Sequence, residues 1–466
     1  MKICFDPMSI RSLIKSQIKL SGRSRVFTTE GAMDRICELA ASNLRFGPGS
    51  TAEVGKDLAE CFKAKRVVVF TDVNIEKLPP MQVLLESLER SNIQFLVYNQ
   101  VRVEPNDVSF RHAIEFLRNL GAYDAVVALG GGSVIDTAKA ANLYASVGTC
   151  DFYDYVNPPI GRGLPIPTAT RLAPLIAIPT TAGTGSETTG VAIFDDTPTK
   201  SKTGIANRSL KPSLGIVDPE NTKTLPERVA VYSGLDVLCH ALESYTALPF
   251  NQRPRPDSPL LRPAYQGSNP ISDVWSIFAL ESAATHLPRA ILDNNDDSRA
   301  HMLIASSAAG LGFGNAGVHL CHGMSYPISS QVKSTYVSDY AGTDHAMIPH
   351  GLSVIVGAPA VFSFTGVANA ERHAKCARIL AKARGFEGGS LNSTKGDYAG
   401  CWLADEIREL LQVVNVPLGL KQFGYTETDI KSLVDGTLPQ HRVTKISPRK
   451  VGRAEIEGLF AAAMAE

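Results

Sequence analysis

Two patterns of hydrophobic positions divide this chain. Between about residues 43 and 210, short apolar runs alternate with stretches in which apolar residues recur at helical spacing. The short runs predict buried strands, and the longer stretches predict amphipathic helices. The predicted strands are residues 66–72, 93–98, 124–129 and 175–178, and the predicted helices are residues 80–90, 108–120 and 136–144. Strands that alternate with helices favour a parallel sheet with helices on its faces.

The pattern changes near residue 226, where long stretches with helical spacing replace the short apolar runs. The predicted helices of this part are residues 228–248, 272–292, 299–312, 367–384 and 402–413. We therefore expect an α/β domain over residues 31–225 and an all-α domain over residues 226–466, with a cleft between them. Segments 250–270 and 385–400 predict surface loops.

The first 30 residues differ from both parts. They contain six basic residues against two acidic ones, with serines interspersed, and residues 10–20 could form one apolar helix face. This composition predicts an organellar transit peptide over residues 1–30, and a basic disordered arm is the alternative.

Overall composition narrows the function classes. The 466 residues are 44% hydrophobic and carry no formal net charge, so nothing indicates a nucleic acid partner. No apolar run approaches the roughly 18 residues of a membrane span. The eight cysteines are scattered without a C-x-x-C pair, which is typical of reduced thiols inside cells.

A glycine-rich segment follows the strand predicted at residues 124–129. Gly130, Gly131, Gly132 and Ser133 stand where this strand passes into a helix. Glycines allow the backbone to approach a ligand closely, and a helix N-terminus favours an anion. The segment therefore predicts a phosphate-binding loop, and a tight turn without a ligand is the alternative.

A second candidate turn covers residues 179–187 and again follows a strand. The hydroxyls of Thr180, Thr181 and Thr184 could hold ribose or phosphate oxygens. Two such turns together favour a dinucleotide. Asp72, at the end of the first predicted strand, could bond a ribose hydroxyl and would repel a 2′-phosphate, which favours NAD over NADP. A strand-end aspartate could equally be a cap.

Histidines supply the candidate metal ligands. Asp236 and His240 are four residues apart on a predicted helix and therefore share one face. They form either a structural pair or part of a metal site. With His350 and one of the pair His319 and His322, they would give one carboxylate and three imidazoles, a set that suits Fe(II) or Zn(II).

Three motifs carry a resemblance to a known family. They are G-G-G-S-x-x-D-x-x-K at residues 130–139, P-T-T-A-G-T-G-S-E at residues 179–187 and D-x-x-x-H-A-L-E at residues 236–243. Together they resemble the iron-containing, group III alcohol dehydrogenases. The resemblance implies an N-terminal dinucleotide-binding domain, a helical C-terminal domain with the metal in the cleft between them, and NAD(P)-dependent oxidation of alcohols or reduction of aldehydes.

The resemblance also assigns residues. It implies metal ligation by Asp236, His240, His322 and His350 and places Asp136 and Lys202 near the cofactor. The family usually has a histidine four residues after its third ligand, where this chain has Tyr326. Either Tyr326 or His319 could pass a proton in its place.

Other passages resemble one mitochondrial branch of the family. They are residues 190–195, 262–270 and 312–329. That branch couples oxidation of 4-hydroxybutyrate to succinate semialdehyde with reduction of 2-oxoglutarate to D-2-hydroxyglutarate. The resemblance thus predicts small-molecule acid substrates, hydride transfer through bound NAD, and a location in the mitochondrial matrix. How tightly NAD is held stays open.

Two other functions stay open: an NAD-dependent alcohol dehydrogenase that releases NADH, and a nucleotide-binding sensor without redox chemistry. A homo-oligomer also remains open. Both acids carry carboxylates, so the cleft should offer a cation. Lys333, Arg253, Arg255 and Arg262 are the candidates, with solvated surface charge as the alternative.

Overall fold

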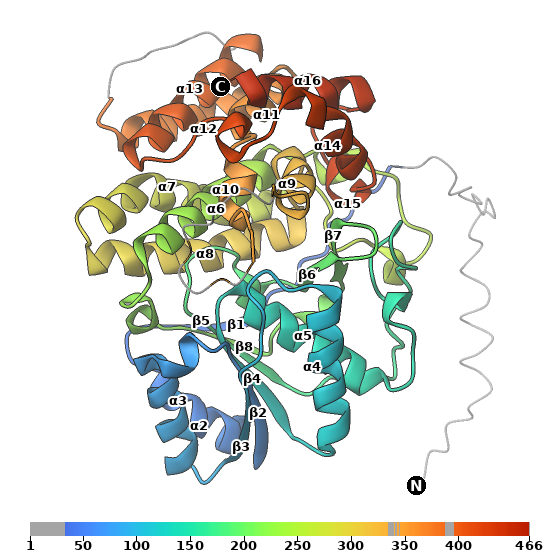
Figure 1. Cartoon of the computed structure of the whole chain (residues 1–466), viewed down its shortest axis with the longest axis vertical. Coiled ribbons are helices and arrows are strands. Elements are labelled where there is room, and N and C mark those ends of the chain that lie inside the picture. Colours follow the sequence, from blue (N-terminus) through green and yellow to red (C-terminus); the bar gives the residue numbers. More distant parts are fainter. Residues whose placement is uncertain (1–32, 334–339, 341–342, 344, 387–395, 466) are drawn as a thin grey trace, which may run out of the picture.

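The computed structural model describes residues 33–465 except 334–339, 341–342, 344 and 387–395. The predicted transit peptide lies outside these residues. The described chain has a sheet half, which is the lower half of Figure 1, and a helical half above it. This arrangement confirms the predicted fold class of a parallel α/β part followed by a helical part. The boundary at residue 226 stays a prediction.

The main sheet has six parallel strands in the order β1-β8-β5-β4-β2-β3. Their bounds are β1 Asn43–Phe46, β2 Arg66–Phe70, β3 Gln94–Tyr98, β4 Ala125–Gly130, β5 Leu175–Pro179 and β8 Leu214–Val217. Four of them match the predicted strands, whereas β1 and β8 were not predicted. An antiparallel hairpin, β6 Val191–Asp196 and β7 Ser201–Ala206, was also not predicted.

Alternate side chains of the central strands pack on opposite faces, as strand geometry requires. In β2, Val67 and Val69 join the core beneath α2 (Val54–Lys56) and α3 (Pro79–Arg90). Val68 and Phe70 join the core beneath helices on the other face. Those helices are α4 Asp107–Leu120 and α5 Gly132–Val147. Because both faces are buried, these strands have continuous apolar runs in the amino-acid sequence.

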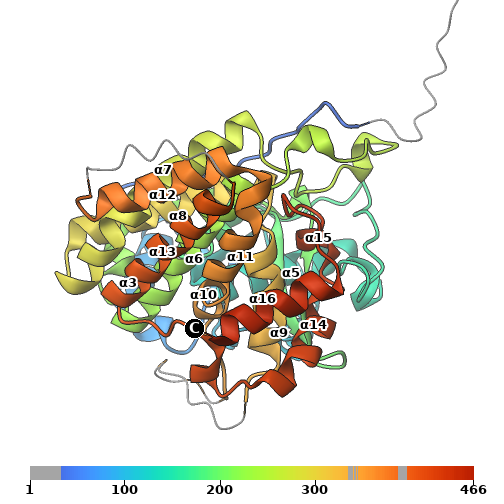
Figure 2. The same cartoon turned by 90° about the horizontal axis from the view of Figure 1, so that it is seen from above.

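The helical half consists of α6 and the helices after it. Their bounds are α6 Glu227–Thr246, α7 Pro270–Leu292, α8 Asp296–Ala316, α9 Leu320–Ser330, α10 His350–Ile355, α11 Ala358–Thr365, α12 Ala370–Ala383, α13 Gly396–Val413, α14 Ile430–Thr437, α15 His441–Thr444 and α16 Arg453–Ala465. The five predicted helices correspond to α6, α7, α8, α12 and α13, and the shorter helices were not predicted. Figure 2 shows the molecule from above, with most of these helices in front of the sheet half.

Strand order determines where a ligand can bind. The chain leaves β2 for the edge strand β3 and then returns past β2 to β4, so the connections diverge between β2 and β4. In open parallel sheets, ligands bind at the carboxyl ends of strands at such a point. This end of the sheet faces the helical half, because Gly132 and Ser133, which follow β4, line one cavity together with Asp236 of α6.

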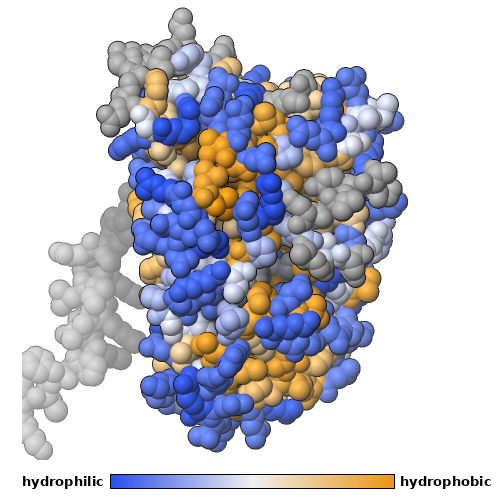
Figure 3. Space-filling model, turned by 60° about the vertical axis from the view of Figure 1, so that its left-hand side comes forward, coloured by the Kyte–Doolittle hydropathy of each residue, from blue (hydrophilic) through white to orange (hydrophobic). Residues whose placement is uncertain are grey.

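The surface is mixed in character. On the face shown in Figure 3, apolar patches lie in both halves and are interrupted by polar residues. Among the described residues, no helix combines the length and apolar character needed to cross a bilayer.

Candidate active site

The two predicted phosphate turns lie side by side. In the register of β4 and β5, Gly130 pairs with Pro179, and the Thr180 N–H donates to the Gly130 carbonyl at 3.1 Å. Parallel neighbouring strands end at the same edge of a sheet, so the turns that follow them meet. The sequence located both turns, and the strand pairing brings them together.

Two glycines of the first turn are required by its geometry. Gly130 has a φ of 157°, and a Cβ built on it would lie 2.5 Å from the Val134 side chain. A Cβ on Gly132 would lie 2.5 Å from Cγ2 of Thr184. The missing side chains therefore let α5 begin directly against the second turn, with Gly131 as its N-cap.

Several polar groups around these turns suit a dinucleotide. Thr180 Oγ1 is buried without a hydrogen-bond partner, and Thr181 lies beside Gly131. Ser133 and Asp136 line a cavity between the two halves, here called the central cavity, whose other walls include Lys202, Asp236, His322, Tyr326 and Arg442. The Asp136 carboxylate accepts hydrogen bonds from the Ser186 hydroxyl at 2.5 Å and the Ile193 N–H at 2.9 Å. An orphaned hydroxyl beside an open helix N-terminus fits a phosphate group.

Asp72 lies just beyond β2, at the divergence point of the sheet. Its Oδ1 accepts hydrogen bonds from the N–H groups of Asn74 at 2.8 Å and Ile75 at 3.0 Å. Asp72 therefore acts as a cap in the described structure. Its position at the carboxyl end of β2 also fits the predicted contact with ribose.

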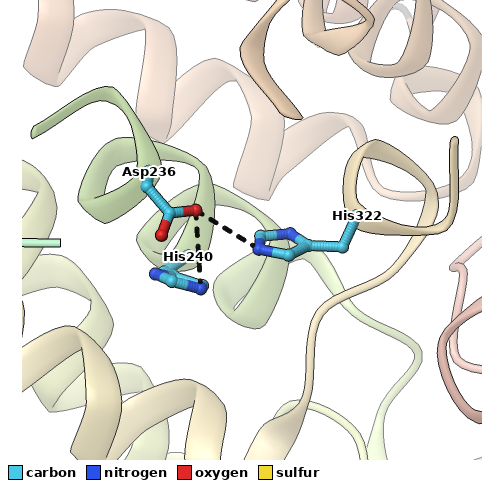
Figure 4. Close-up of side chains that lie close together, drawn as sticks. All are labelled: Asp236, His240 and His322. Carbon is cyan, nitrogen blue, oxygen red and sulfur yellow. Dashed lines mark ion pairs between the residues drawn. The ribbon is translucent and has the colours of Figure 1, made fainter. Parts of the chain in front are cut away.

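Three of the four predicted metal ligands, Asp236, His240 and His322, bring donor atoms within 4.8 Å of one another, and His350 lies beside Asp236. Asp236 and His240 are presented by α6, His322 by α9, and His350 is the first residue of α10. Asp236 Oδ1 lies 3.7 Å from His240 Nε2, 3.4 Å from His322 Nε2 and 3.7 Å from His350 Nε2. Figure 4 shows the first three of these side chains pointing toward one another.

These spacings are those of ligands around an ion. Two donors each about 2.1 Å from a tetrahedral metal lie about 3.4 Å apart. Asp236 Oδ1 and His322 Nε2 are both buried without a hydrogen-bond partner. Buried polar atoms left unpaired are costly, so the donor set fits a metal ion better than it fits a structural pair.

The protonation of the cluster differs from ligand to ligand. Burial would lower the pKa of His322, but Glu243 and Asp236 raise it above its usual range, so a metal bound here would displace a proton from this ring. Asp236 and His240 already have the form that a metal requires. Burial alone would raise the pKa of Asp236, but the neighbouring imidazoles hold that pKa below its usual range. Burial lowers the pKa of His240 to about 3, despite the opposing effect of Asp236. At neutral pH, Asp236 is therefore ionised and His240 neutral, as metal ligation requires.

Glu243 is a further site residue, and its motif alone did not indicate a role for it. It is fully buried, and its Oε2 contacts Nδ1 of His322. Its Oε1 accepts hydrogen bonds from the N–H groups of His319 at 3.0 Å and Cys321 at 2.7 Å. Glu243 thus fixes both the His322 ring and the start of α9. The available signal was its spacing, three residues after His240 on the same helix face.

The two candidates for proton transfer lie in different places. Tyr326 follows His322 by one turn of α9 and lines the cavity. Its hydroxyl oxygen accepts a hydrogen bond from Arg442 Nη2 at 2.7 Å. His319 is fully buried, 3.0 Å from Thr246 Oγ1, and is not among the residues that line the cavity.

The predicted lysine lines the same cavity. Lys202 Nζ lies 2.6 Å from Glu104 and 3.4 Å from Asp195. Burial would lower the pKa of this ammonium group, but the two carboxylates raise it above its usual value. Lys202 is thus a charged residue whose charge is already balanced.

The cations predicted to receive substrate carboxylates lie outside this cavity. Arg253 Nη2 is 2.6 Å from Asp34, and Arg262 Nε is 3.4 Å from the same carboxylate. Lys333 Nζ lies 2.5 Å from Asp429. Arg255 is exposed.

The prediction that residues 250–270 form a surface loop is wrong for its last part. Residues 265–268 include Tyr265, Gln266 and Ser268, which are buried. The reason is visible in the backbone, because the Gln266 and Gly267 N–H groups donate to carbonyls at the end of α8.

Comparison with known proteins places this geometry in context. The family description "iron-containing alcohol dehydrogenase" matches residues 41–219, and the corresponding C-terminal description matches residues 264–464. The chain is 52% identical over 461 residues to a Xenopus tropicalis protein named hydroxyacid-oxoacid transhydrogenase, mitochondrial, with 98% of this chain and 97% of that protein covered. It is 54% identical to a Bos taurus protein of the same name, with 92% and 90% covered.

Solved structures agree with these matches. A 1,3-propanediol oxidoreductase superposes with a TM-score of 0.76 at 26% identity, covering 92% of this chain and all of that one. An alcohol dehydrogenase from Oenococcus oeni gives the same TM-score at 24% identity, covering 92% and 100%, and so supports the fold.

Proposed function

The chain belongs to the iron-containing alcohol dehydrogenase family, and we propose that it acts as a hydroxyacid–oxoacid transhydrogenase. It oxidises 4-hydroxybutyrate to succinate semialdehyde and reduces 2-oxoglutarate to D-2-hydroxyglutarate. The observation that carries this function is the identity of more than half the residues, over nearly the whole chain, with relatives of that name. The converging donor set supports the redox chemistry and disfavours a sensor without catalysis.

Asp236, His240, His322 and His350 would hold the metal, and their oxygen and nitrogen donors suit Fe(II) or Zn(II). When bound, the metal supplies Lewis acidity toward the substrate oxygen, and NAD supplies a reversible hydride acceptor. The protein residues place the substrate oxygen, exclude water and move its proton.

NAD would be held at the carboxyl ends of β2, β4 and β5, where Asp72 and the two phosphate turns follow the strands. The residues proposed to contact it are Asp72, Gly130, Gly131, Gly132, Ser133, Asp136, Thr180, Thr181, Thr184 and Lys202. The carboxylate of Asp72 favours NAD over NADP because it would repel a 2′-phosphate.

Tyr326 moves the substrate proton. Its oxygen accepts from Arg442, so its own O–H is free to turn into the cavity beside His322. A phenol can donate and accept a proton at this position, where the family usually has a histidine. We prefer Tyr326 to His319 because only Tyr326 lines the cavity.

The location follows from the N-terminal composition and from the relatives, whose names include "mitochondrial". We infer that residues 1–30 direct the protein to the mitochondrial matrix. Sequencing the N-terminus of the mature protein from mitochondria tests this, because a terminus near Met1 would contradict it.

Turnover without added nucleotide tests the central proposal. Purified protein is supplied with 4-hydroxybutyrate and 2-oxoglutarate together, and 2-hydroxyglutarate is measured. We expect several equivalents of product per subunit, since a retained cofactor cycles between the two substrates. If product requires free NAD, and NADH accumulates with 4-hydroxybutyrate alone, the protein is instead a dehydrogenase that releases its cofactor.

A further inference from the structure

We propose that Arg442 binds the carboxylate that lies two methylene groups from the reacting carbon in both substrates. This contact makes the site selective for acids over uncharged alcohols. This inference rests on the proposed function, because it identifies the group that recognises the substrate in the same cavity. Arg442 lies on the short helix α15, and no sequence motif marked it as a candidate.

Arg442 lies on the same side of the cavity as the metal ligands, where it contacts α9. Its side chain lines the cavity together with Asp236 and His322. Nη2 donates to the Tyr326 hydroxyl at 2.7 Å, and the guanidinium carbon lies 4.7 Å from the centre of the Tyr265 ring. Because Tyr326 follows His322 by one helical turn, both project from the same face of α9 toward the cavity.

The charge of Arg442 has no carboxylate partner among the described residues. Its neighbours at the cavity are the phenols of Tyr326 and Tyr265, and Nη1 is buried without a hydrogen-bond partner. A guanidinium group with an unused donor in a partly buried position is poorly compensated. A bound carboxylate would supply both the missing charge and the missing acceptor.

The other cation of the cavity is already compensated. Lys202 is flanked by Glu104 at 2.6 Å and Asp195 at 3.4 Å. Two carboxylates around one ammonium leave no net attraction for a third. Within the described part of the cavity, Arg442 is therefore the cation best placed to attract an acid.

The structures of the two substrates are consistent with one carboxylate-binding group that serves both. In 4-hydroxybutyrate, two methylene groups separate the hydroxyl-bearing carbon from the carboxylate. In 2-oxoglutarate, two methylene groups separate the keto carbon from the distal carboxylate. One fixed cation can thus place the reacting carbon of either acid at the same point, as alternating use of one hydride position requires.

A substitution at Arg442 tests this inference through a ratio. Arg442→Met keeps an apolar side chain of similar reach but removes the charge. The kcat/KM for 4-hydroxybutyrate is divided by that for 1-butanol, which has the same carbon chain without a carboxylate. We expect this ratio to fall on the order of 100-fold, because a charged, directional contact is lost only by the acid. Arg442→Lys should give an intermediate ratio.

Calorimetric binding of 2-oxoglutarate adds a readout that does not need turnover, and it should weaken in parallel. Arg449→Met is the matched control: Arg449 lies outside the cavity, donating to the Phe364 carbonyl at 3.0 Å. An unchanged ratio and unchanged acid binding in Arg442→Met would overturn the inference, and so would equal losses with acid and alcohol, since those indicate a structural role.

The two proposals fail in different experiments. If the wild-type protein turns over no acid, the proposed transhydrogenase function fails, whereas calorimetry still decides whether Arg442 binds an acid. If the wild type turns over both acids and the variant does so equally well, only the role of Arg442 fails. Thermal unfolding of each variant identifies loss of fold, in which case Arg442→Lys decides.

Discussion

Glu243 contacts Nδ1 of His322, whereas Nε2 of the same ring faces the carboxylate of Asp236. The carboxylate is fully buried and also accepts hydrogen bonds from backbone N–H groups at the start of α9. A histidine ligand held in this way has a fixed tautomer, with its proton on Nδ1 and its lone pair on Nε2. Glu243 therefore positions His322 although it does not itself face the site.

The first prediction concerns Glu243→Gln. The amide is similar in size but lacks the charge that holds the Nδ1 proton, so we expect metal affinity to fall about 10–100-fold. Metal retained against a chelator measures this effect. The matched control is Glu227→Gln, an exposed glutamate on the same helix. Retention of metal equal to wild type in Glu243→Gln would show that the contact does not orient the ligand.

Tyr326→Phe should slow catalysis. Loss of the phenol removes the proposed proton carrier, so we expect kcat to fall about 100-fold. Initial rates at saturating acid measure kcat apart from KM. Tyr326→His restores the residue that the family usually has and should recover part of the loss. Equal kcat values for wild type and the phenylalanine variant would exclude Tyr326 as the carrier.

The sequence predicted those site residues that belong to short motifs within one element or one turn. Gly130–Ser133 were recognisable because a strand passes directly into a helix there, and Asp236 and His240 because one helical turn separates them. His319 and His322 could not be distinguished in this way. The structure separates them because α9 begins at Leu320, which leaves His319 outside the helix and facing Thr246.

Other features depended on contacts between distant segments. Arg442 follows Tyr326 by 116 residues, and no local pattern marks an arginine that meets a phenol across the fold. The strands β1 and β8 were missed because each has four residues, too few for a clear period. They are held in the sheet by strand pairing, because β8 pairs with β5 on one side and with the edge strand β1 on the other.

Gly132→Ala should weaken cofactor binding. The new Cβ would lie 2.5 Å from Thr184 Cγ2, so the second turn must shift away from the first. We expect NADH affinity to fall about 10-fold, since the open helix N-terminus is disturbed. Fluorescence titration measures the affinity. Gly458→Ala, in α16, is the control, because a methyl group added there would have no neighbouring atom within 4 Å.

A normal NADH affinity in Gly132→Ala would mean that cofactor binding does not depend on the close approach of the two turns. A loss shared by Gly458→Ala would indicate a general effect of adding a methyl group to a helix. Thermal unfolding separates a local shift from global destabilisation, since only the latter lowers the melting temperature by several degrees.

The lowered pKa of Lys211 predicts that the stability of the fold changes with pH, independently of the active site. Its ammonium group donates to the Thr188 carbonyl at 2.9 Å, and burial, aided by nearby positive charges, lowers its pKa to about 8. The ordinary lysine pKa is about 10.4. Between these two pH values the unfolded chain binds more protons at this position, so the free energy of unfolding rises with pH there.

Lys211→Met keeps the apolar part of the side chain but cannot titrate. Urea unfolding at pH 7.5 and pH 10 should therefore show wild type gaining stability relative to the variant by on the order of 1 kcal/mol, after allowance for solvent screening. Lys421→Met, at an exposed position, should show no such gain. A constant difference between wild type and Lys211→Met would mean that Lys211 keeps its proton equally well in both states, which would contradict the lowered pKa.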